Sequence, residues 1–213
     1  MKAVIKVSLY LALGDSITAG YGVSSSFSFP TIYANFLSRH HSDLCLLNQG
    51  VNGLTTSELL NLVRVNQGLR HSITQAALIT LTIGSNDFLN LIENGNFDQA
   101  FNPSQLPFIL KNMSNTLAQV GEEMRRLNSG ATVKVATLYN PLPAGPYAHF
   151  SALVQRVIAS ANRIIVSWAK HYGAVVVFLD REIRGKEQFL IGQDYAHPNE
   201  AGYQVIAKAF ARY

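Results

Sequence analysis

Residues with the chemistry of acyl transfer recur in four short polar stretches of the sequence. These stretches read GDSIT (14–18), NQGVNGLTT (48–56), GSND (84–87) and DYAH (194–197). A serine hydroxyl is a weak nucleophile alone, so it needs an imidazole as base and a carboxylate that holds the imidazole in the right tautomer. Hydrogen-bond donors must also face the oxygen on which negative charge develops. The residue types in these stretches therefore indicate acyl transfer through a serine nucleophile.

Taken one at a time, these residues also have ordinary structural explanations. Ser16 could cap a helix, and Asn86 with Asp87 could form a turn and a cap. Gly53 could occupy a turn position with positive φ, and His197 could be a surface histidine before a helix. Their joint occurrence, each at the end of a strand or the start of a helix, favours the catalytic interpretation.

Short apolar runs alternate with longer segments of helical spacing along the chain. The apolar runs predict strands at 7–14, 43–49, 77–84, 132–139 and 174–180, and the longer segments predict helices at 29–40, 55–69, 104–128, 150–172 and 199–212. Nearly continuous apolar strands are typical of parallel sheets covered on both faces. We therefore expect one three-layer α/β/α domain over residues 1–213, with a five-stranded parallel sheet. Right-handed crossovers place its functional loops at the carboxyl ends of the strands.

The four polar stretches together resemble the GDSL esterase/lipase family, the SGNH hydrolases. They occur in the order of the family's sequence blocks and span residues 14 to 197. The resemblance implies a flavodoxin-like strand order, 2-1-3-4-5. The serine lacks the second glycine of the G-x-S-x-G elbow, which disfavours the α/β-hydrolase fold. Ser85 stands where many family members carry another small residue, whereas Gly84, Asn86 and Asp87 match.

The resemblance also implies a role for each matching residue. Ser16 would be the nucleophile, His197 the general base, and Asp194 the carboxylate that orients His197. The backbone N–H groups of Ser16 and Gly53 and the side-chain amide of Asn86 would hold the oxyanion. Glycine allows a close approach of its backbone amide, and an asparagine amide stays a donor at any pH. Activity should fall between about pH 8 and 5, where an imidazole base gains a proton.

Other titratable residues are expected to have structural roles. Asp180 ends the fifth predicted strand and is the alternative partner for His197. Asp15 and Asp87 are expected to brace loops or cap helices. The remaining histidines, none of which has a carboxylate motif nearby, are His40, His41, His71, His149 and His171. Among them only His149, on the 139–149 loop, could touch a substrate.

The composition argues for a folded protein without metal or nucleic-acid chemistry. Of 213 residues, 48% are hydrophobic and 14% charged, which is too apolar for a disordered chain. The net charge of +4 comes from scattered Lys and Arg residues rather than from a basic cluster, so no nucleic-acid partner is expected. The single cysteine, Cys45, lies in an apolar run and is expected to pack in the core. We expect no metal site and no cofactor.

The N-terminus has some features of a secretory signal. Lys2 and Lys6 precede the apolar run VSLYLALG, as in a short signal peptide. Cleavage of a signal peptide here would remove the core strand that presents GDSIT. The segment therefore cannot be both a signal peptide and a core strand. No run reaches the roughly 18 apolar residues of a membrane span. We expect a cytoplasmic protein without stable membrane insertion, and the sequence does not indicate its oligomeric state.

The loops that would choose the substrate are rich in apolar side chains. These loops cover 22–30, 88–107 and 139–149, and their apolar residues are Phe27, Phe29, Phe88, Leu89, Phe97, Phe101 and Tyr147. They favour a small-molecule ester with an acyl or lipid chain. Two alternatives stay open: a deacetylase of an acetylated carbohydrate, and a catalytically silent flavodoxin-like binding module. The second would lack the G-x-G-x-x-G and Walker patterns that cradle phosphates.

Overall fold

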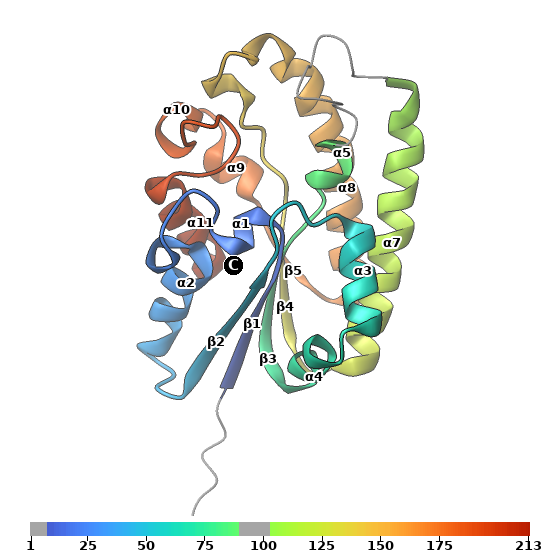
Figure 1. Cartoon of the computed structure of the whole chain (residues 1–213), viewed down its shortest axis with the longest axis vertical. Helices are drawn as coiled ribbons and strands as arrows, with labels where there is room; N and C mark the ends of the chain where they lie inside the picture. The colour runs from blue at the N-terminus through green and yellow to red at the C-terminus, as the bar shows by residue number, and fades with distance from the viewer. Residues whose placement is uncertain (1–7, 90–102) are drawn as a thin grey trace, which may run out of the picture.

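A parallel five-stranded sheet with helices on both faces forms the centre of the protein (Figure 1). The computed structural model describes residues 8–89 and 103–213. The strand order is β2-β1-β3-β4-β5, which confirms the expected order 2-1-3-4-5. The strands are β1 (Ser8–Gly14), β2 (Leu44–Gly50), β3 (Ala76–Thr82), β4 (Thr132–Ala136) and β5 (Val175–Val177).

The sheet separates the two large apolar clusters of the core, and each of them lies under one helical layer. Helices α2 and α11 cover one face of the sheet, and α3, α4, α7 and α8 cover the other (Figure 1). Their bounds are α2 (Phe29–Ser38), α3 (Thr56–Val65), α4 (Gln67–Gln75), α7 (Leu106–Leu127), α8 (Ser151–Tyr172) and α11 (Glu200–Arg212). Shorter helices lie in the connections: α1 (Ser16–Ala19), α5 (Asn86–Leu89), α9 (Leu179–Ile183) and α10 (Glu187–Leu190).

Strand β1 lies near the middle of the sheet and is covered on both faces. Its residues 10–13 are almost fully buried, which explains why the sequence there is continuously apolar. Gly14, its last residue, pairs with Gly50 of β2 and Thr82 of β3. The carboxyl ends of three strands are therefore level, and the residues that follow them meet at one edge of the sheet. Residues 1–6, which carry the lysines of the signal-like pattern, lie outside the described part of the chain.

Three predicted elements have clearly different ends in the structure. The fourth strand, predicted at 132–139, stops at Ala136. The helix predicted at 55–69 is two helices, α3 and α4, because Asn66 has an extended backbone (φ −79°, ψ 103°) and its side chain accepts a hydrogen bond from the Leu69 N–H. Asparagine commonly ends one helix and caps the next in this way. The fifth strand stops at Val177, and Asp180 lies in α9 rather than at a strand end.

The prediction that Cys45 packs in the core is wrong. Cys45 is exposed on β2, which is an edge strand of the sheet. Side chains alternate between the faces of a strand. Leu44 and Leu46 point to the face that α2 covers, whereas Cys45 points to the opposite face, at the open edge of the sheet.

None of the helices in the described segments, 8–89 and 103–213, is both long enough and apolar enough to cross a bilayer.

Candidate active site

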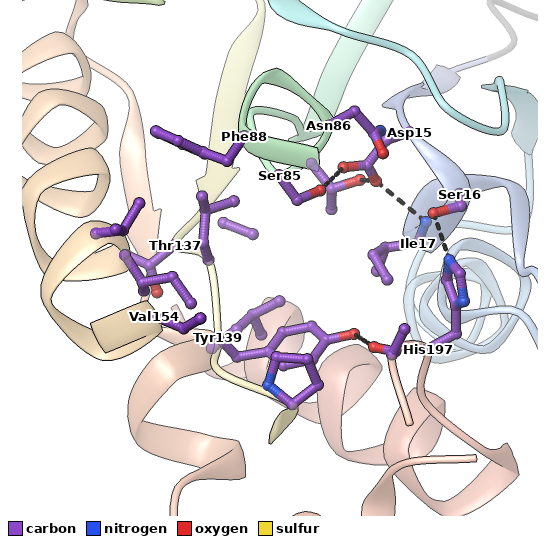
Figure 2. Close-up of a pocket in the computed structure, with 18 of the residues that line it drawn as sticks. Asp15, Ser16, Ile17, Ser85, Asn86, Phe88, Thr137, Tyr139, Val154 and His197 are labelled. Atoms are coloured by element: carbon purple, nitrogen blue, oxygen red, sulfur yellow. Dashed lines mark hydrogen bonds between the residues drawn. The ribbon is translucent and has the colours of Figure 1, made fainter. Parts of the chain in front are cut away.

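Ser16, His197 and Asp194 form one hydrogen-bonded series at the carboxyl edge of the sheet. The Ser16 Oγ lies 2.9 Å from Nε2 of His197, and Nδ1 of the same ring lies 2.6 Å from Oδ2 of Asp194. An ionised carboxylate only accepts hydrogen bonds, so the ring proton belongs on Nδ1 and Nε2 is left as the acceptor for the Ser16 hydroxyl. This arrangement can move a proton from the hydroxyl to the ring (Figure 2).

The sharp exit from β1 places Ser16 at the start of α1. Gly14 has φ +146°, and a Cβ there would lie 2.2 Å from the carbonyl oxygen of Thr82, so only glycine fits. Asp15 is the N-cap of α1, and its Oδ1 accepts a hydrogen bond from the Ile17 N–H (3.1 Å). The interpretation of Ser16 as the cap is therefore wrong. Ser16 follows the cap, is only 8% exposed, and presents its hydroxyl to His197.

Asp15 braces the ends of two strands rather than facing the histidine. Besides the Ile17 N–H, its carboxylate accepts hydrogen bonds from the hydroxyls of Thr82 (2.8 Å) and Ser85 (3.1 Å). Burial raises the pKa of Asp15, and these hydrogen bonds lower it by less. The carboxylate fastens the end of β1 to the end of β3, as the sequence predicts for a bracing residue.

The turn at 194–197 carries both the carboxylate of Asp194 and the imidazole of His197. Oδ1 of Asp194 accepts hydrogen bonds from the backbone N–H groups of Ala196 (3.1 Å) and His197 (3.0 Å). The Gly192 N–H donates to the His197 carbonyl oxygen (2.8 Å), which closes the turn. Burial raises the pKa of Asp194, but the hydrogen bonds from the two N–H groups and the His197 ring outweigh it, so the pKa lies below its ordinary value.

The two other carboxylates considered from the sequence have partners of their own. Asp180 accepts a hydrogen bond from the Thr137 hydroxyl (2.6 Å) and lies 3.6 Å from Arg184, so it does not orient His197. Asp87 accepts hydrogen bonds from the backbone N–H and the hydroxyl of Thr56, the first residue of α3. Burial raises the pKa of Asp87.

Gly53 and Asn86 meet at the same edge of the sheet. The Leu54 N–H donates to the Val51 carbonyl oxygen (3.2 Å), and Gly53 at the third position of this turn has φ +80°. A turn of this type requires glycine for its backbone, and a Cβ at Gly53 would otherwise meet open space. Nδ2 of Asn86 donates to the Leu54 carbonyl oxygen (2.9 Å), which joins Asn86 to the turn. An amide carries two N–H hydrogens, so one remains for another acceptor.

An apolar cavity of about 200 Å³ opens beside Ser16 and His197. Figure 2 shows these two residues at one end of its lining and Phe88 and Val154 at the other. Phe88, Leu142 of the 139–149 loop and several residues of α8 contribute to the apolar lining. The residues from α8 are Leu153, Val154, Val157 and Ile158. A ligand bonded to Ser16 could therefore extend an apolar chain toward α8.

The sequence model of the GDSL-like lipase/acylhydrolase family matches residues 12–205. The chain belongs to this family. It is therefore an ester-hydrolysing serine hydrolase, and the resemblance seen in its four polar stretches is confirmed. A search of curated protein sequences finds no match.

Solved structures of a lipase and of two esterases share the fold. The lipase Lip_vut3 from a goat rumen metagenome has a TM-score of 0.83 at 22% identity, with 96% of each chain covered. The esterase EstA from Pseudoalteromonas sp. has a TM-score of 0.68 at 19% identity, covering 96% of this chain and 95% of that one. A variant of Axe2, an acetyl-xylooligosaccharide esterase from Geobacillus, has a TM-score of 0.72 at 18% identity, covering 98% and 95%. At these identities the likeness shows the three-layer fold.

The apolar loop residues of this GDSL hydrolase lie in different environments. Phe88 lines the cavity, whereas Phe29 is buried in the core and stacks on Phe210. Phe27 and Tyr147 are exposed. The side chain of Leu89 and all of Phe97 and Phe101 lie outside the described part of the structure.

The histidines outside the DYAH turn all lie at the surface. His40, His41, His71, His149 and His171 are exposed. Across residues 8–89 and 103–213, no three His, Cys, Asp or Glu side chains are grouped so as to hold a metal ion.

Two tyrosines next to the site were missed from the sequence. The Tyr21 ring lies 4.3 Å from the His197 ring, centroid to centroid, and is 46% exposed. The Tyr139 hydroxyl donates to the carbonyl oxygen of Ala196 (2.9 Å), next to His197 (Figure 2). A positional signal existed for Tyr139, because it ends the predicted strand 132–139 at the edge where functional side chains gather.

Proposed function

We propose that this GDSL hydrolase cleaves carboxylic esters through a covalent acyl-Ser16 intermediate. The observation that carries this proposal is the series Asp194, His197 and Ser16 at the mouth of an apolar cavity. Ser16 Oγ attacks the ester carbonyl carbon while its proton passes to Nε2 of His197. The protonated ring then gives that proton to the leaving alcohol oxygen. A water molecule, deprotonated by the same ring, attacks the acyl-serine, and the ring returns the proton to Ser16.

The same proposal assigns the oxyanion to three donors. The backbone N–H of Ser16 is at the first position of α1, where an amide has no partner within the helix. The Gly53 N–H and the second hydrogen of the Asn86 amide complete the set. Loss of one such donor costs about 3 to 4 kcal/mol of transition-state stabilisation.

The cavity favours an ester with an apolar acyl chain. An apolar cavity of about 150 Å³ takes up benzene, so about 200 Å³ suits, in proportion, an acyl chain of about eight carbons. An acetyl group would leave most of this apolar space unfilled. Lipid esters and thioesters of such an acid share this chemistry, and a carbohydrate deacetylase is the alternative.

The proposed function is tested with p-nitrophenyl esters of graded chain length. Ser16→Ala should lose at least about a thousandfold in kcat, whereas Ser57→Ala, at an exposed serine of α3, should keep the wild-type rate. Thermal unfolding of both variants checks that the fold is intact.

Three other results would point elsewhere. Equal rates for wild type and Ser16→Ala would refute the nucleophile. Highest activity on the acetate ester would favour the carbohydrate deacetylase, and wild-type inactivity on every ester would favour the silent binding module.

A further inference from the structure

The wall of the cavity is hydrogen-bonded to the turn that carries His197. Tyr139 follows β4, its ring lines the cavity, and its hydroxyl donates to the carbonyl oxygen of Ala196 (2.9 Å) (Figure 2). Ala196 precedes His197 in the chain. One side chain therefore touches both the space offered to a substrate and the backbone that positions the base.

The backbone that precedes Tyr139 is hydrogen-bonded to α8. The side chain of Asn162 in α8 accepts a hydrogen bond from the Leu138 N–H (2.8 Å) and donates one to the Leu138 carbonyl oxygen (2.9 Å). The backbone just before Tyr139 is thus fixed to a long helix. Burial raises the pKa of Tyr139 far above its ordinary value, so its hydroxyl stays a donor throughout the pH range of an assay.

The turn at 194–197 has features that a hydrogen bond from outside the turn would stabilise. Tyr195 has φ +57°, a conformation that residues other than glycine rarely adopt, and 40% of the Asp194 side chain is exposed. The backbone of Ala196 has two hydrogen bonds: its N–H donates to Asp194, and its carbonyl oxygen accepts from Tyr139. Without the Tyr139 hydroxyl, the hydrogen bonds of the turn itself and the contact with the Tyr21 ring would be left to keep His197 beside Ser16.

We propose that Tyr139 is a positioning residue for ester hydrolysis. Its hydroxyl fixes the Ala196 carbonyl and so holds Nε2 of His197 at hydrogen-bonding distance from Ser16, while its ring shapes the acyl cavity. This role rests on the proposed function, because it acts through His197 and touches no reacting atom. Both acylation and deacylation use His197, so the hydroxyl acts on kcat whichever step limits the rate.

The test is Tyr139→Phe, which removes the hydroxyl and keeps the ring in the cavity wall. A hydrogen bond to a backbone carbonyl corresponds to about a three- to tenfold effect, so kcat should fall by about that factor on both butyrate and octanoate esters. KM should stay within about twofold, because the cavity keeps its shape.

Tyr172→Phe is the matched control. It also removes a tyrosine hydroxyl that donates to a backbone carbonyl, that of Ala118 (2.8 Å), but between α7 and α8. Its kcat and KM should both equal those of the wild type. Thermal unfolding of both variants separates a loss of stability from a loss of positioning.

Several results would overturn the role of Tyr139. These are a wild-type kcat in Tyr139→Phe, a changed KM at constant kcat, and an equal loss of kcat in Tyr172→Phe. If Ser16→Ala is inactive and Tyr139→Phe has the wild-type kcat, only the positioning role fails. If Ser16→Ala retains the wild-type rate, the proposed function fails and the role of Tyr139 fails with it.

Discussion

Two carboxylates near Ser16 have pKa values shifted in opposite directions, and their surroundings explain why. Asp15 is buried between strand ends, and burial raises its pKa more than its hydrogen bonds lower it. Burial also raises the pKa of Asp194, but the partly exposed turn gives it two backbone N–H groups and the His197 ring, and these lower it further. The turn therefore favours the ionised form of Asp194, the carboxylate that contacts the His197 ring, and this form suits it to stabilise a protonated imidazole.

Replacing Asp194 should impair catalysis strongly. Asp194→Asn removes the charge and allows the wrong ring tautomer, so kcat should fall on the order of 10³- to 10⁴-fold in an ester assay. Asp180→Asn is the control, because Asp180 contacts Thr137 and Arg184 rather than the ring. A loss in Asp180→Asn as large as that in Asp194→Asn would contradict the assignment.

Activity should fall toward acid pH. A protonated imidazole cannot take the Ser16 proton, so protonation of His197 would stop the first step. Asp194 has a lowered pKa, so its carboxylate stays ionised above about pH 5 and does not cause this fall. Measurements of kcat/KM from pH 5 to 8 should decrease toward acid. A flat profile would count against His197 as the base.

At the scale of elements, α8 forms one wall of the apolar cavity. Val154, Val157 and Ile158 of this helix line it. Each buried CH₂ group contributes about 0.8 kcal/mol of binding free energy. This corresponds to about a fourfold rise in kcat/KM for each CH₂ group added to the acyl chain, until the cavity is full. A rise followed by a plateau along the ester series would therefore measure the depth of the cavity.

A larger side chain on α8 should shorten the preferred chain. Val154→Phe places an aromatic ring in the cavity, so kcat/KM on an octanoate ester should fall more than about tenfold while that on acetate changes little. Val166→Phe is the matched control, since Val166 is exposed on the same helix. Equal losses on acetate and octanoate in Val154→Phe would show that the acyl chain does not bind in this cavity.

For the whole molecule, the features that could be predicted from the sequence are those that depend on local pattern. The apolar runs became the strands, and the first three polar stretches came to one edge because the carboxyl ends of β1, β2 and β3 are level. The fourth stretch, at 194–197, precedes α11 and reaches the same edge through the contact of His197 with Ser16. The Asp194 and His197 pair is only three residues apart, so its contact is also local.

The features that were mispredicted or missed depend on residues far away in the chain. Cys45 is exposed because β2 lies at the edge of the sheet, and an apolar run alone does not tell an edge strand from a central one. Asp180 is bound by Thr137 of a neighbouring segment. The contact between Tyr139 and Ala196 joins residues 57 positions apart. No local pattern contains these neighbours.

The stability of the whole molecule should depend on pH through Asp15. Its pKa is higher in the folded protein than in the unfolded chain, where it is about 3.9, so ionisation costs more in the folded state. Its contribution to the free energy of unfolding is complete below about pH 4 and is lost as pH rises through the raised pKa. Asp15→Asn removes this dependence, and an amide can still accept from the Ile17 N–H and the Thr82 hydroxyl and donate to Ser85.

Urea unfolding of Asp15→Asn and wild type from about pH 4 to 8 measures the effect. The free energy of unfolding of the variant, relative to that of the wild type, should rise with pH. Asp194→Asn is the contrasting variant: its lowered pKa keeps the wild-type carboxylate ionised, so its difference from wild type should stay constant above about pH 5. A constant or falling difference for Asp15→Asn over the whole range would mean that the folded protein does not raise the pKa of Asp15, and that its bracing hydrogen bonds outweigh its burial.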